Sequence, residues 1–254
     1  MLRWDKLAAQ EVFEFLLVFT RLSGVFLFMP VFSSRYIPRR IRLLFAVILA
    51  FMMTPVLSKL VPEMPASALE LARLLFVEAT VGLFLGMFPY FLMSAIDLVG
   101  TAASQATGFS NAMAFDPSTN VQSTLLTTFL TLTGLVLIVV TDTHYVMLGS
   151  LVSSYGLFPV GAGLPAEDMA GQLTSALSSS FTYGFQIASP FIIMTVLLYS
   201  SMGVMSRLMP QLNIMFVVMP LQVYLGMALM MISISLMMRW FLSYFEDGVR
   251  LFAM

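Results

Sequence analysis

The chain has 254 residues, of which 59% are hydrophobic and only 10% are charged, and its formal net charge is −1. Soluble domains carry about 25% charged residues, so this chain cannot cover a water-facing surface, and the composition indicates an integral membrane protein. The near-neutral charge gives no basis for nucleic-acid binding. The absence of Cys excludes disulfides, thiolate metal sites and cysteine nucleophiles.

Strongly apolar runs predict membrane helices, since about 20 residues cross the hydrocarbon core. These runs cover residues 12–32, 41–61, 71–93, 125–140, 181–205 and 214–238. A further run, 145–160, is shorter and contains Ser, Gly and Pro, so its crossing is left open. Residues 167–180 are polar and predict a short surface helix. The pattern predicts an all-α integral membrane protein of helical hairpins.

Prolines and glycines inside these runs predict bent and closely packed helices. Pro89, Pro190 and Pro220 each remove one helical hydrogen bond and are expected to kink their helices. Gly82 and Gly86 lie four residues apart, a spacing that lets two helix backbones approach each other.

Charge placement gives an expected orientation. Four arginines crowd the loop at residues 35–42, and the positive-inside rule places such a loop in the cytoplasm. The N-terminus would then start on the opposite side of the membrane.

Three charged residues, Arg21, Glu78 and Asp97, fall within or just beyond apolar runs. A charge at the centre of a membrane helix costs about 2.5–3.5 kcal/mol on insertion scales, so Arg21 needs a partner. Candidates are Glu78, Asp97 or a carboxylate on another subunit. A proton or ion relay is possible in principle, but a pair that fixes helix register is favoured because no chain of acids is present.

The segment from Gln105 to Asn120 is too polar and too rich in Gly, Pro and Asn to face lipid. Irregular backbone survives at membrane depth only against protein or water. The segment is interpreted as a plug that closes a pore, with a buried connector as the alternative. The residues expected to form the plug are Gly108, Phe109, Met113, Phe115, Asp116 and Pro117.

No enzymatic or metal site is predicted. The chain has one His, His144, and lacks a phosphate-binding loop, a dinucleotide fingerprint, a zinc motif and a catalytic triad spacing. No cofactor is expected. Bent helices with intramembrane charge are also typical of secondary transporters, so a transporter of ions or small solutes is the alternative function, with substrate bound near Glu78 or Asp97.

Taken in order along the chain, several short motifs together resemble the FliR family of type III secretion export-gate proteins, flagellar and virulence-associated, over nearly the whole sequence. These motifs are Arg-Leu-Ser-Gly at 21–24 followed by Pro30, Glu-x-x-x-Gly-x-x-x-Gly at 78–86, Asp-Pro at 116–117, and Arg-Leu-Met-Pro-Gln-Leu-Asn at 207–213.

The resemblance implies a non-enzymatic subunit of the flagellar export gate in the bacterial inner membrane, at the basal body. Such proteins assemble with FliP and FliQ into a helical channel for unfolded export substrates, beside FlhB and FlhA. Residues 1–175 would be FliP-like and residues 176–254 a FliQ-like hairpin, while residues 108–120 would correspond to the plug. The hairpin turn would use Arg207, Pro210, Gln211 and Asn213. Much of such an assembly can lie above the membrane plane.

Overall fold

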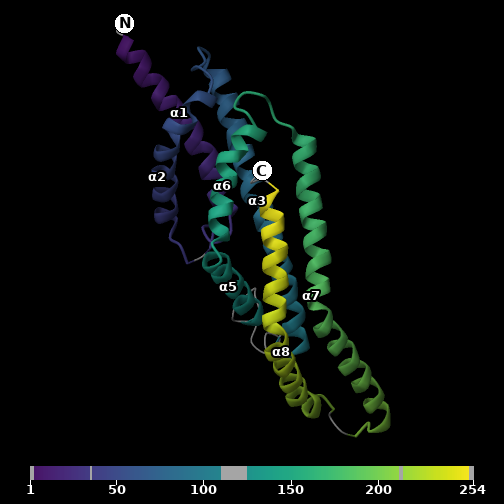
Figure 1. The fold of residues 1–254 in the computed structure, drawn as a ribbon. Helices are drawn as coiled ribbons and strands as arrows, with labels where there is room; N and C mark the ends of the chain where they lie inside the picture. Colours follow the sequence, from purple (N-terminus) through teal and green to yellow (C-terminus); the bar gives the residue numbers. More distant parts are fainter. Residues whose placement is uncertain (1–2, 35, 110–124, 212–213, 252–254) are drawn as a thin grey trace. The chain divides into compact units, whose positions relative to one another are not determined.

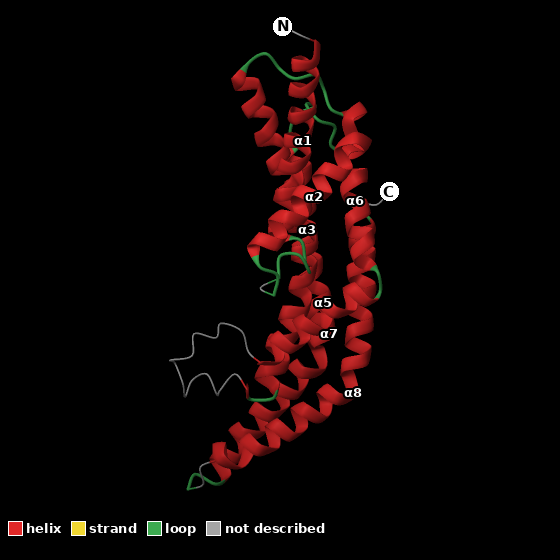
Figure 2. Cartoon of the chain, turned by 90° about the vertical axis from the view of Figure 1, so that its left-hand side faces the viewer, coloured by secondary structure: helices red, strands yellow, loops and turns green. Residues whose placement is uncertain are grey.

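A computed structural model describes residues 3–34, 36–109, 125–211 and 214–251, and within these ranges the chain forms helices and no strand (Figures 1 and 2). The helices are α1 (Arg3–Phe28), α2 (Arg39–Leu57), the short 3₁₀ helix η1 (Ser58–Leu60), α3 (Ala68–Ala106), α5 (Leu125–Val140), α6 (Thr143–Leu157), α7 (Ala166–Leu208) and α8 (Ile214–Arg250).

The predicted all-α membrane fold is confirmed. By length and composition, four of the described helical stretches can cross a membrane, namely Arg39–Leu60, Ala68–Ala106, Ala166–Leu208 and Val218–Arg250. The number rises to five if α5 and α6 together form one broken span. The helix α1 is not among the candidates because charged residues interrupt its apolar sequence, although the sequence predicted a membrane helix at 12–32.

Three helices are much longer than their apolar runs. α3 has 39 residues, α7 has 43 and α8 has 37, and each continues through its proline, Pro89, Pro190 or Pro220. At 1.5 Å per residue they are about 55–65 Å long. The hydrocarbon core is about 30 Å thick. The surface helix expected at 167–180 is the first part of α7, where Glu167 and Asp168 suit the positive end of the helix dipole.

The described residues divide into two compact units, each built from distant parts of the sequence. The first contains the described residues within 1–91, 141–176 and 246–254, and the second contains those within 92–140 and 177–245. This division differs from the FliP-like and FliQ-like portions expected at 1–175 and 176–254, which remain a prediction.

In the first unit, glycines bring the backbones of α1 and α3 into contact. A Cβ atom added at Gly82 would overlap the carbonyl oxygen of Arg21, and one added at Gly86 would lie 2.5 Å from the carbonyl oxygen of Val25. On α1, a Cβ atom added at Gly24 would lie 3.0 Å from the carbonyl oxygen of Ala79 in α3. Lipid gives no hydrophobic drive for helix association, so this close packing is an important source of attraction between the two helices.

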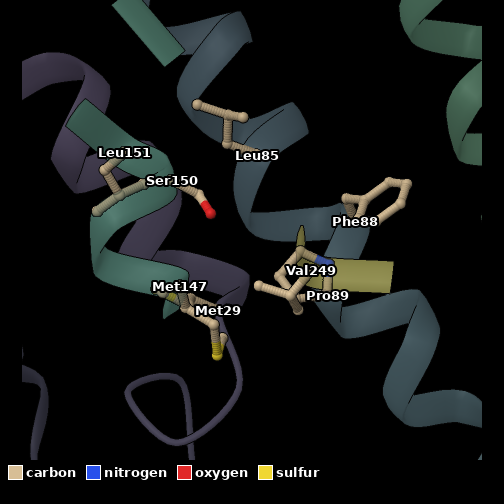
Figure 3. A pocket seen from close by; sticks show the side chains of 8 residues that line it. All are labelled: Met29, Leu85, Phe88, Pro89, Met147, Ser150, Leu151 and Val249. Atoms are coloured by element: carbon tan, nitrogen blue, oxygen red, sulfur yellow. The ribbon is translucent and has the colours of Figure 1, made fainter. Parts of the chain in front are cut away.

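The first unit also contains a small apolar cavity beside the proline of α3 (Figure 3). Pro89 cannot donate a backbone hydrogen bond, so the helix is weakened at this turn. The cavity is lined by Met29, Leu85, Phe88, Pro89, Met147, Ser150, Leu151 and Val249.

In the second unit, small residues again set the distance between helices. Gly100 of α3 lies against the backbone of Thr127 in α5, and Gly184 of α7 meets the carbonyl oxygen of Ala95. The rings of Tyr183 in α7 and Tyr244 in α8 stack with centroids 4.4 Å apart. These contacts pack α5 and α7 against the second half of α3, and α8 against α7.

Replacing Gly82 with Ala should destabilise the protein, because the new Cβ meets backbone atoms of Arg21 that cannot rotate away. Overpacking of this kind typically costs about 1–3 kcal/mol. Thermal unfolding of the detergent-solubilised protein measures the loss. The matched control is Gly149→Ala in α6, where no atom lies within 4 Å of the added Cβ. Equal unfolding temperatures for the two variants would contradict the proposed packing role.

Candidate functional site

Arg21 of α1 and Glu78 of α3 form a buried ion pair in the first unit. Both side chains are only 1% exposed. The Nε of Arg21 donates to Oε2 of Glu78 at 2.5 Å, and Nη2 donates to Oε1 at 3.0 Å. This two-point geometry is the strongest form of an Arg–carboxylate interaction. Gly82 lies one turn after Glu78 and allows the approach of α1 that the pair requires.

The helix α6 completes the surroundings of the guanidinium. Nη2 of Arg21 also donates to the backbone carbonyl of Phe158 at 2.9 Å, just after the last turn of α6, and Nη1 donates to Oγ of Ser154 at 3.3 Å. The ring of Tyr155 lies under the guanidinium, with the central carbon 3.8 Å from the ring centroid, a cation–π contact. Arg21 therefore joins α1, α3 and α6.

The geometry suits a structural role for this charge pair. Each carboxylate oxygen of Glu78 accepts a hydrogen bond from Arg21, so neither is left without a partner in this burial. A transporter site near Glu78 would need a carboxylate that can bind solute, whereas this one is engaged by its own chain. A buried pair is costly to desolvate, and its best-attested benefit is to fix which helices meet and in which register.

Asp97 lies in the second unit and has a different environment. It is exposed, and its Oδ1 accepts a hydrogen bond from Oγ1 of Thr131 in α5 at 2.7 Å. It therefore does not belong to the Arg21 cluster.

Asp97 is part of a polar face on the second half of α3. Ser94, Asp97, Thr101 and Gln105 follow each other at intervals of three, four and four residues, so they share one side of the helix. Three of them are exposed and Ser94 is half-buried. Most of the intervening residues, including Ile96, Val99 and Ala103, are buried in the unit.

The predicted plug begins where this polar face ends. Gly108 has a φ of +76°, the left-handed conformation that glycine adopts easily at a helix C-terminus, and Phe109 is half-buried. Met113, Phe115, Asp116 and Pro117 lie outside the described residues.

The expected hairpin turn lies between α7 and α8. Arg207 is in the last turn of α7, where a cation suits the negative end of the helix dipole. Pro210 and Gln211 are exposed in the connection, and Asn213 lies outside the described residues.

Sequence reasoning missed Ser154, Tyr155 and Phe158 around Arg21. It also missed Gln222 of α8, whose Nε2 donates to the backbone carbonyl of Gln105 in the second unit. Phe158 acts through its backbone carbonyl, which carries no sequence signal. The polarity of Gln222 within an apolar helix was a usable signal, because a buried amide needs a partner.

Residues 12–248 match the family described as bacterial export proteins, family 1. The flagellar biosynthetic protein FliR of Caulobacter vibrioides is 33% identical over 227 residues, which cover 89% of this chain and 90% of that protein. FliR of Bacillus subtilis is 29% identical over 224 residues, covering 87% and 86%. FliR of Escherichia coli is 29% identical over 203 residues, covering 79% and 76%.

The helices long and apolar enough to cross a membrane place the chain in the class of all-α integral membrane proteins. The extent of the matches shows that the chain belongs to the FliR family of bacterial export proteins, which confirms the resemblance found in its motifs.

Removing one member of the Arg21–Glu78 pair should lower the stability of the protein far more than removing both members. Glu78→Met or Arg21→Met leaves an uncompensated buried charge, with an expected loss of about 3–5 kcal/mol. The double variant removes both charges and should recover most of that loss. Thermal unfolding in detergent and the amount of protein in the membrane measure the effect.

The matched control for these variants is Glu70→Met, at an exposed position in the first turn of the same helix. Its unfolding temperature and its amount in the membrane should remain close to those of the unmodified protein. If the double variant loses as much stability as the sum of the two single variants, the residues are not energetically coupled and the structural role is wrong.

Proposed function

We propose that the chain is a non-enzymatic subunit of the flagellar type III export gate, which forms and plugs the channel for unfolded flagellar proteins in the inner membrane. Its partners in this role are FliP and FliQ in the channel core, with FlhB and FlhA beside it. Membership of the bacterial export family and the similarity to FliR proteins over most of the chain support the assignment.

The observation that carries the channel role is the polar face of α3. An exposed carboxylate that faced lipid would cost about 3 kcal/mol at the centre of a membrane helix. Intramembrane polar residues therefore face a water-filled space or another protein. Ser94, Asp97, Thr101 and Gln105 extend over about 16 Å at 1.5 Å per residue. This length suits one wall of a wet passage for polypeptide.

The length of the helices supports an assembly that extends beyond the bilayer. α3, α7 and α8 are about twice as long as the hydrocarbon core is thick. Their exposed apolar side chains must be covered by lipid along one part and by neighbouring subunits along the rest. Partner subunits of similar helical construction, as FliP and FliQ are expected to be, would provide that cover.

The segment at 108–120 follows directly from this polar face, and its composition suits a plug. Phe109, Met113 and Phe115 are apolar residues that can exclude water from a narrow passage and so block ions without any chemical step. Entry of an unfolded substrate would displace them at modest cost, because substrate binding shifts the equilibrium towards the open state.

Cysteine labelling tests the wet passage directly, because the chain contains no Cys. In assembled complexes, Thr101→Cys should react with a membrane-impermeant thiol reagent, because water reaches this side chain. The reaction is measured in both right-side-out and inverted vesicles, and it is expected in at least one of them. The matched control is Ile193→Cys on α7, an exposed apolar position in the same unit that should face lipid or a partner and stay unreactive. If Thr101→Cys is as unreactive as Ile193→Cys in both orientations, the polar face does not line the passage.

The plug is tested by measuring membrane conductance. Deleting residues 108–120, or replacing Phe109, Met113 and Phe115 together with Ser, should make the assembled complex leak ions because water can then fill the passage. Replacing Ser118 and Thr119 with Ala in the same segment is the control and should leave conductance unchanged. Co-purification with FliP and FliQ verifies assembly, and an intact complex that remains tight after the deletion would exclude the plug.

A further inference from the structure

Gln222 of α8 is a buried polar residue that the proposed function does not yet use. Its side chain is 4% exposed, and its Nε2 donates to the backbone carbonyl of Gln105 at 2.9 Å. The same carbonyl accepts the backbone N–H of Gly108 at 3.1 Å. The carbonyl of Gln105 at the end of α3 thus accepts one hydrogen bond from the residues that follow it and one from α8.

One turn further along α8, Gly226 adds a second contact with the same part of α3. A Cβ atom added at Gly226 would lie 2.5 Å from Cγ2 and 2.8 Å from Cα of Thr107, which is itself fully buried. Residues at positions i and i+4 share a helix face, so Gln222 and Gly226 meet α3 together. The backbone of α8 therefore lies directly against the last residues of α3.

We propose that Gln222 and Gly226 form a clasp that fixes the end of α3 and so sets the position from which the chain continues beyond Gly108. Gln222 is the positioning residue, because its amide satisfies a carbonyl at the helix end that would otherwise have one partner fewer. Gly226 provides the space that lets α8 come close enough. Gln222 contacts Gln105 and lies next to Gly108, and Gly226 contacts Thr107; all of these residues belong to the second unit.

The clasp links the hairpin of α7 and α8 to the segment that begins at Gly108. Pro220 lies two residues before Gln222 and lacks the N–H of a helical hydrogen bond, so α8 bends most easily next to the clasp. The link from clasp to closure rests on the proposed function, in which the segment after Gly108 is the plug.

The experiment uses the complete complex with its partner subunits. Gln222→Met keeps the size and apolar packing of the side chain and removes the hydrogen-bond donor. A reporter, Phe109→Cys, is introduced into the Cys-free chain, and its reaction rate with a maleimide is measured. Without the clasp the rate should rise by about fivefold, the factor expected for loss of one buried hydrogen bond. The matched control is Gln186→Met on α7, an exposed glutamine in the same unit, which should leave the rate unchanged.

Ion leak is measured in the same variants without the reporter, so that the clasp and the plug are tested separately. Faster labelling with a leak supports both. Faster labelling without a leak supports the clasp and counts against the plug. An unchanged labelling rate in an assembled Gln222→Met complex overturns the clasp.

Hydrogen exchange in the unmodified complex gives a second test that needs no variant. The amides of Thr107 and Gly108 should exchange much more slowly than that of Met209, an exposed residue directly after the last residue of α7. Equally fast exchange at the two helix ends would also overturn the clasp.

Discussion

The first unit of this protein is organised by the buried ion pair between Arg21 and Glu78. An isolated charge in an apolar interior is too costly to tolerate, so α1 and α3 must meet at these two positions and in no other register. The glycines at 24, 82 and 86 make that meeting possible by letting the backbones touch. α6 then supplies the remaining hydrogen-bond acceptors and an aromatic ring.

The second unit handles polarity in the opposite way. Three of its polar residues on α3, Asp97, Thr101 and Gln105, are exposed, while Gln222 is buried and donates a hydrogen bond to the end of that helix. Within one chain, then, polar groups form a buried ion pair, an exposed face on one helix, and a hydrogen bond from one helix to the end of another. As in the first unit, glycines let the helices of the second unit approach closely, here at Gly100, Gly184 and Gly226.

The sequence predicted the helices better than their lengths and the contacts between them. The run at 125–140 coincides with α5, but α3 continues to Ala106 and α7 begins at Ala166, well outside their apolar runs. Hydropathy detects residues suited to lipid, whereas a helix continues wherever its backbone is paired and no breaker intervenes. Glu78 was among the candidate partners of Arg21, but tertiary geometry alone could select it. The carbonyl of Phe158 and the hydroxyl of Ser154 could not be foreseen from composition.

The sequence distance across the buried pair has a consequence for biogenesis. Glu78 is synthesised 57 residues after Arg21, and Phe158 follows 137 residues after it. Besides Arg21, α1 also carries Glu11 and Glu14 within its apolar stretch. During translation Arg21 therefore has no partner, and lipid would penalise its early release from the insertion machinery. α1 is expected to wait beside the translocon until α3 has emerged, so that the two enter the bilayer together as a preformed hairpin-like pair.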